Sequence, residues 1–147
     1  MPTLIYASSQ DCEAAFYRAF ETADLAAMMA VWAEEDDIVC VHPGGQRLTG
    51  LEEVRESWRQ IFAGGPGLRL RLSHVMITST LQTAIHTVHE HLSVPGDTRT
   101  RVPMIATNVY LRTQRGWRLQ LHHASAAPAQ PAEAPREPRN TRPPLLH

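Results

Sequence analysis

The sequence lacks an excess of charge of one sign and lacks any long apolar run. It contains 14 basic and 15 acidic residues, so its formal net charge is -1, and no electrostatic argument favours a nucleic acid or an anionic membrane as partner. No apolar run is long enough to span a bilayer. Residues 1–16 also lack the basic and apolar regions of a signal peptide. We therefore expect a cytoplasmic protein.

Cysteine is also scarce. The two cysteines, Cys12 and Cys40, do not have the spacing of metal ligands, and we expect both to be small hydrophobic residues in a reducing compartment. The chain has 147 residues, of which 43% are hydrophobic. A chain of this size forms one domain and can bury a core without disulfides.

Residues 8–62 have the periodicity of helices, interrupted by one short hairpin. Ser8 or Ser9 is expected to cap a first helix, and Asp24 a second helix that continues through Trp32. The β-branched run 38–41 predicts a buried strand. A Gly-Gly turn and a return strand at 46–49 then lead to an amphipathic helix at 51–62.

From residue 68 the hydrophobic period changes from helical to two. Four alternating segments are separated by turn signals and predict an antiparallel meander: 68–80, 82–94, 101–113 and 117–126. Helices followed by strands indicate an α+β fold, in which three helices pack on one face of a curved antiparallel sheet of four to six strands. We assign this domain to residues 1–127.

The C-terminal residues 128–147 differ in composition from the rest of the chain. The segment 126–147 holds 6 of the 11 prolines and has no apolar period. It predicts a disordered or extended tail with polyproline II character. The alternative is that its prolines form a ligand for a proline-binding domain.

His42 is the first candidate functional residue. It stands where the apolar strand ends, before Pro43, and the following helix carries Trp58 on its apolar side. Its ordinary pKa near neutrality suits a general base. The alternative is a structural histidine that bonds to the backbone of the Gly44-Gly45 turn.

Two further candidates lie in the predicted strands. Asn108 shares a face with Ala106 and Tyr110, and a buried amide needs partners, which either a ligand carbonyl or neighbouring backbone can supply. His123 follows Leu121 at period two and is expected to line the pocket, with a core histidine as the alternative.

A dense histidine cluster lies in the segment 86–91. His89 and His91 share one face of the predicted strand, and His86 and Glu90 share the other. The first pair, with a histidine of another strand, offers a metal-site alternative, but nothing in the spacing requires it and we predict no metal. His86 and Glu90 are expected to form a surface or dimer-interface pair.

The order of these parts resembles the nuclear transport factor 2-like superfamily, and within it the SnoaL-like and ketosteroid-isomerase-related branch. The resemblance covers residues 8–127 and rests on TADLAAMMAVWAEEDDIVCVHP, the helix that follows TG, and the meander ending in HHAS. It implies a cone-shaped half-barrel whose open end is a deep pocket. It also implies pairing of two copies through the outer face of the sheet.

The resemblance to the isomerase assigns its catalytic positions one at a time. His42 stands where the isomerase has its carboxylate base, and Phe16 where it has its phenol, with Tyr17 pointing elsewhere. Asn108 stands where it has a protonated acid, and Trp58 corresponds to a pocket aromatic. Because the isomerase's own chemical groups are replaced, the resemblance does not imply steroid isomerase activity.

We therefore predict a pocket for a small apolar ligand with a carbonyl group, and cofactor-independent proton transfer as its chemistry. His42 would act as base, while Asn108 and His123 would donate hydrogen bonds to the oxyanion. The predicted ligand contacts are Phe16, Trp58, His89 and Leu121. The alternatives are a binding protein without turnover and an oligomerising association domain.

A homodimer is the predicted assembly. The strands place apolar residues on both faces of the predicted sheet, at Val75 and Ile77, Ile105 and Val109, and Val88 and Leu92. The second face of the sheet needs a cover, and a second copy of the chain can provide it.

Overall fold

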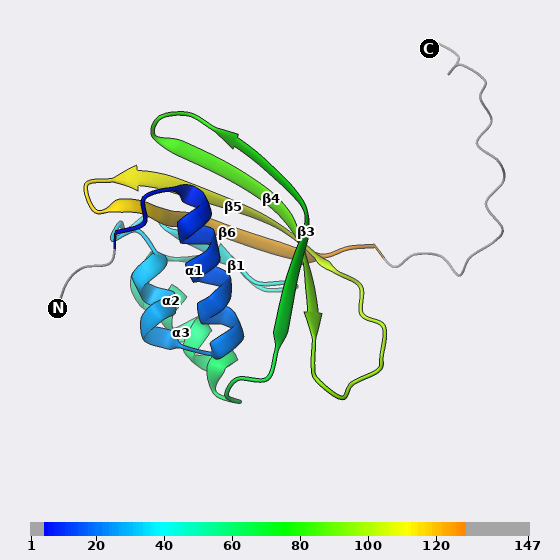
Figure 1. Cartoon of the computed structure of the whole chain (residues 1–147). Coiled ribbons are helices and arrows are strands. Elements are labelled where there is room, and N and C mark those ends of the chain that lie inside the picture. The colour runs from blue at the N-terminus through cyan, green and yellow to red at the C-terminus, as the bar shows by residue number, and fades with distance from the viewer. Residues whose placement is uncertain (1–4, 129–147) are drawn as a thin grey trace, which may run out of the picture.

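The computed structural model describes residues 5–128, in which three helices pack on one face of a six-stranded sheet (Figure 1). The helices are α1 (Ser9–Thr22), α2 (Leu25–Val31) and α3 (Gly50–Phe62). This arrangement confirms the predicted α+β fold. The predicted tail, 128–147, lies outside the described residues except for Pro128. No helix within 5–128 is long and apolar enough to cross a membrane.

Short-range hydrogen bonds explain where the helices begin. The Ser8 hydroxyl accepts a bond from the Asp11 N–H at 3.0 Å, so Ser8 is the N-cap of α1. Asp24 caps α2 in the same way through the Ala27 N–H at 3.0 Å. At α3 the cap residue Thr49 is the donor instead of the acceptor: its backbone N–H donates to the Glu53 carboxylate at 2.8 Å.

The sheet has the strand order β2-β1-β6-β5-β4-β3 and two free edges. Its strands are β1 (Val39–Val41), β2 (Leu48–Thr49), β3 (Arg69–Ser79), β4 (Thr83–Ser93), β5 (Met104–Thr113) and β6 (Gly116–Ala126). The four long strands form the predicted antiparallel meander.

The sheet is mixed rather than antiparallel throughout, which corrects the sequence-based prediction. β1 runs parallel to β6, with Cys40 beside His122. The chain already runs parallel to β6 before β1 begins. Trp32 forms a parallel bridge with Leu119, and the Ala33 N–H donates to the Leu119 carbonyl at 2.9 Å. A strand that starts beside β6 in this way can only continue along it.

An irregularity in β6 decides which of its side chains face the helices. The register with β5 shifts between the pairs Val109–Leu121 and Tyr110–Leu119, so Gln120 is an extra residue in β6. The alternation is reset there: Leu119 and His122 are buried on the inner face, whereas His123 is exposed. The predicted inward position of His123 is therefore wrong.

The core lies between the helices and the inner face of the sheet. Its largest fully buried side chains include Trp32, Trp58, Tyr110 and Phe16. Polar side chains are also buried there, and they belong to the site described next.

Candidate functional site

A pocket of about 730 Å³ opens between the β1–β2 turn and α3. Its walls combine the apolar Leu48 and Ile61, the amides Gln46 and Gln60, the acids Glu52, Glu53 and Glu56, and the residues His42, Gly45 and Ser57. A concave site with a few converging polar groups on apolar walls is typical of small-molecule binding.

His42 lines this pocket and points toward α3. Its Nε2 atom lies 3.0 Å from the Ser57 hydroxyl oxygen, and its ring meets the Trp58 ring edge-on with centroids 4.7 Å apart. The alternative that its side chain bonds to the turn backbone is therefore wrong. The His42 carbonyl, not its imidazole, accepts the Gly45 N–H at 2.8 Å.

The environment keeps His42 neutral. Burial lowers the pKa of His42 below its usual 6.5, because the charged imidazolium loses solvation. The Ser57 hydroxyl donates to the Val54 carbonyl at 2.7 Å, which favours the tautomer in which His42 Nε2–H donates to the Ser57 oxygen, with the Cys40 sulfur also 3.5 Å from Nε2. This arrangement leaves the lone pair on His42 Nδ1, the atom that can accept a proton.

Aromatic side chains form the floor behind His42. The Trp58 ring lies 5.7 Å from Phe16 and 5.0 Å from Phe20 between centroids, both in edge-to-face geometry. Phe16 and Trp58 are fully buried and do not line the open pocket. Trp58 packs against the His42 ring, and Phe16 packs against Trp58.

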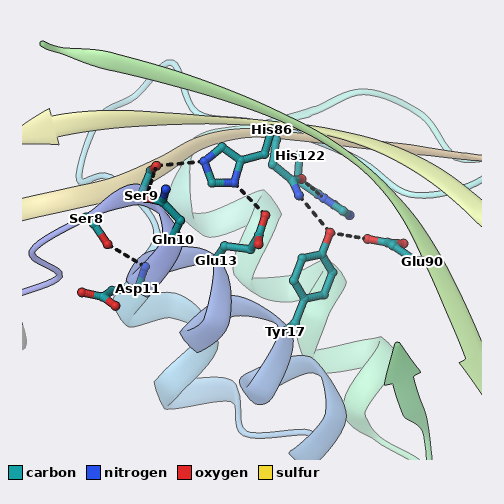
Figure 2. A network of polar contacts seen from close by, with 10 residues as sticks. Ser8, Ser9, Gln10, Asp11, Glu13, Tyr17, His86, Glu90 and His122 are labelled. Carbon is teal, nitrogen blue, oxygen red and sulfur yellow. Dashed lines mark hydrogen bonds and ion pairs between the residues drawn. The ribbon is translucent and has the colours of Figure 1, made fainter. Parts of the chain in front are cut away.

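A chain of buried polar groups continues beneath this floor (Figure 2). Tyr17 donates to the Glu90 carboxylate at 2.7 Å and accepts a bond from the Asn108 amide nitrogen at 2.8 Å. The Asn108 oxygen is 2.6 Å from His122 Nδ1 and accepts a hydrogen bond from His122 Nδ1–H. Every donor in this chain points toward Glu90, so the bonds polarise one another in a single direction.

The charge states in this chain follow from burial. Burial, and then the neighbouring His42 and His123, lower the pKa of His122 to about 3, so His122 is neutral at pH 7. Burial raises the pKa of Glu90, and the bond from Tyr17 partly opposes that rise. The His122 ring lies 6.4 Å from the His42 ring, which joins the buried chain to the pocket.

A second polar cluster fastens the start of α1 to β4 (Figure 2). His86 Nε2 is 2.8 Å from the Ser9 hydroxyl, and His86 Nδ1 is 2.6 Å from the Glu13 carboxylate. His86 and Glu90 are both buried, so the prediction that they form a surface or interface pair is wrong. The reason is that Ser9, Glu13 and Tyr17 are spaced by four on one face of α1 and supply partners for both.

Several predicted site residues lie away from the pocket. His123 is exposed on the outer face of the sheet. Leu121 and His89 also lie on the outer face, which they share with their cross-strand partners Val39 and Ile105. Asn108 is buried as predicted in the core, but its amide is committed to Tyr17 and His122.

Sequence reasoning missed four residues of the site: Ser57, Tyr17, Glu90 and His122. The four-residue spacing of Ser9, Glu13 and Tyr17 was the available signal for the buried network. Ser57 precedes Trp58 in the sequence, but only the fold shows that it meets His42.

The described residues offer no evident metal site. Within 5–128 no group of three or more histidine, cysteine, aspartate or glutamate side chains is placed to hold a metal ion. Cys12 and Cys40 are free and buried, and burial raises the pKa of each thiol to about 12. Both thiols are therefore protonated at neutral pH.

Comparison with known proteins gives a family and several structural relatives. The sequence model of the SnoaL-like domain family matches residues 10–130. The F-box protein SKIP8 of Arabidopsis thaliana is 27% identical over 110 residues, which are 75% of this chain. The match spans only 46% of the length of that protein.

Two solved structures resemble the chain over most of its length. A protein from Thiobacillus denitrificans, described as a candidate calcium/calmodulin-dependent protein kinase type II association domain, is 38% identical, with a TM-score of 0.76, over 84% of this chain and 98% of that one. A protein from Streptomyces avermitilis, described as a candidate dehydratase of the NTF2-like family, is 32% identical, with a TM-score of 0.74, over 82% of this chain and 94% of that one.

Proposed function

Because the chain belongs to the SnoaL-like domain family, we propose that it binds a small molecule in the His42 pocket and transfers a proton to or from it without a cofactor. The observation that carries this proposal is a neutral histidine on the wall of a pocket of about 730 Å³. The similarity to a candidate dehydratase, 32% identical, supports the same class of chemistry.

In this proposal His42 acts as the general base through Nδ1. Ser57 and Trp58 hold the ring, so the base needs little reorganisation when a ligand arrives. The proton would come from a carbon next to a carbonyl group, because such a carbon is acidic enough for an imidazole to accept its proton.

The hydrogen-bond donors for the ligand carbonyl differ from those expected from the sequence. Asn108 is committed inside the core and His123 faces away, whereas Gln46 and Gln60 line the pocket. The Gln60 amide nitrogen donates one proton to Glu56 at 3.3 Å and keeps a second proton for a ligand. We propose these two amides as the donors that stabilise the developing oxyanion.

Replacing His42 with Gln should remove proton transfer and leave the fold intact. Glutamine can still donate to Ser57 but has no titratable nitrogen, so the rate should fall about a hundredfold or more. The measurement is solvent-deuterium exchange at the carbon next to the carbonyl, followed by NMR over a panel of small ketones and enones. The melting temperature should change little, because His42 lies at the edge of the core.

The matched control is His123→Gln, which alters an exposed histidine on the other side of the sheet. Exchange should continue in this variant at the wild-type rate. If His42→Gln and wild type exchange equally, His42 is not the base. Ligand-dependent stabilisation of wild type without any exchange would show binding without turnover.

A second proposal concerns assembly, and the outer face of the sheet supports it. Ile85, Val109, Leu121 and Val39 lie side by side on four neighbouring strands, and Ile85 is 42% exposed. The next row is formed by Thr87, Thr107, His123 and Val41. Neither row contains an acidic residue, a lysine or an arginine.

We propose that two copies pair through these rows. A face without charge of one sign can meet its own copy across a two-fold axis without repulsion. The 38% identity to a candidate association domain supports the proposal. The apolar row of Ile85, Val109, Leu121 and Val39 would otherwise remain in contact with water.

Sedimentation equilibrium at pH 7.5 tests the pairing. Wild type should sediment as a dimer at micromolar concentration, and Val109→Arg should shift it to monomer by placing a charge within the interface. Leu81→Arg is the matched control, because Leu81 is 78% exposed in the β3–β4 turn and lies off the rows. A wild-type monomer would refute the proposal.

A further inference from the structure

Three histidines gather on the outer face where β3 meets β4. The rings of His74 and His89 are stacked, with centroids 4.4 Å apart and planes 25° apart. The Ser73 hydroxyl lies 2.8 Å from His74 Nδ1 and 2.6 Å from His91 Nε2. Ser73 thus links His74 with His91, and stacking links His74 with His89; we call these three histidines the outer histidine cluster.

The cluster depends on an irregularity in β3. The register with β4 shifts between Ser73 and Met76, and His74 has a φ angle of 53°, in the left-handed region. Few residues other than glycine adopt this conformation, although histidine does so more often than most. The irregularity places the His74 ring over His89, which a regular strand would not do.

The surroundings of His91 disfavour its protonation. Burial, and then Arg71, His89 and His74, lower the pKa of His91. On β5, Ile105 lies opposite His89, and on β6, Ser125 lies opposite Ile105. Neither Ile105 nor Ser125 carries a charge. On β3, Arg71 lies opposite His91 and carries a positive charge, and His123 of β6 lies in the next row.

The cluster borders the rows through which we propose that two copies pair. His89 and Ile105 form the continuation of those rows along β4 and β5. Across a two-fold axis both copies contribute the same surface, so the proposed pairing would place the clusters of both copies at one interface.

We propose that the outer histidine cluster makes the pairing of two copies dependent on pH: neutral imidazoles permit the pair, and their protonation separates it. This inference rests on the pairing proposed above. Protonating three histidines in each of two copies would add as many as six positive charges beside Arg71, which lies opposite His91 and already carries one. Both the loss of solvation and the mutual repulsion of these charges oppose association.

Sedimentation equilibrium at pH 7.5, 6.5 and 5.5, at constant ionic strength, tests the proposal. The dimer dissociation constant of wild type should rise at least about tenfold between pH 7.5 and 5.5, the change expected for linkage to one or more protons. The triple variant His74→Gln, His89→Gln and His91→Gln should pair equally at all three pH values. Circular dichroism and tryptophan fluorescence at pH 5.5 check that the fold persists.

The outcomes separate this inference from the pairing itself. A dimer whose dissociation constant does not change with pH leaves the pairing intact and overturns the pH dependence. A monomer at pH 7.5 overturns both. His123→Gln serves as the comparison on the same face. If that single change abolishes the pH dependence while the triple variant retains it, the outer histidine cluster is not responsible.

Discussion

Replacing Asn108 with Leu is expected to lower the free energy of unfolding by about 2 to 6 kcal/mol. Leucine has the same branched arrangement of side-chain heavy atoms but cannot replace either hydrogen bond, so the Tyr17 oxygen loses the donor Asn108 and His122 Nδ1–H loses its acceptor. Each buried group left without a partner costs about 1 to 3 kcal/mol. Asn108 is fully buried, so water cannot replace the lost partners without opening the core.

Urea denaturation at pH 7 measures this loss. Gln82→Leu is the matched control, because it makes the same change from an amide to leucine at an exposed residue of the β3–β4 turn, off the rows through which we propose that two copies pair. It should change stability by less than about 0.5 kcal/mol, as surface substitutions usually do. Similar losses in the two variants would contradict the role assigned to the buried polar chain.

Acidification is expected to destabilise the protein through His122. The pKa of this residue is about 3 in the folded protein, against an ordinary value of 6.5. Below pH 6.5 the unfolded chain therefore binds a proton that the folded protein does not, and stability falls as the pH decreases. The loss from this residue alone should be about 2 kcal/mol at pH 5 and about 4 kcal/mol at pH 3.

Other buried groups also change the free energy of unfolding over this pH range, some by lowering it and some by raising it as the pH falls. The lowered pKa of His42 acts in the same direction as that of His122, whereas the raised pKa of Glu90 acts in the opposite direction. The variant His122→Gln isolates the His122 contribution, because glutamine can donate to Asn108 but does not titrate.

Urea denaturation of both proteins between pH 7 and pH 4 gives the comparison. Wild type should lose stability more steeply than His122→Gln as the pH falls. Parallel curves would show that His122 does not remain neutral in the folded protein.

Local chemistry made much of this fold predictable. Ser8 and Asp24 cap α1 and α2 because each side chain reaches an N–H three residues ahead. The change from a helical period to a period of two marks the passage from helices to strands. Such features involve residues close in sequence, and they hold whatever the rest of the chain does. His42 could be identified as a pocket residue for a similar reason, because it ends a buried strand before a turn.

The sequence by itself therefore determined the order of helices and strands, the helix starts and the place of His42 at a strand end. Only the tertiary structure decided the direction of β1 beside β6, the extra residue Gln120 that turns His122 inward and His123 outward, and the burial of Glu90. The physical reason is that these outcomes depend on partners distant in sequence. Glu90 is buried because Tyr17, on α1, is there to bind it, and no local pattern in β4 carries that information.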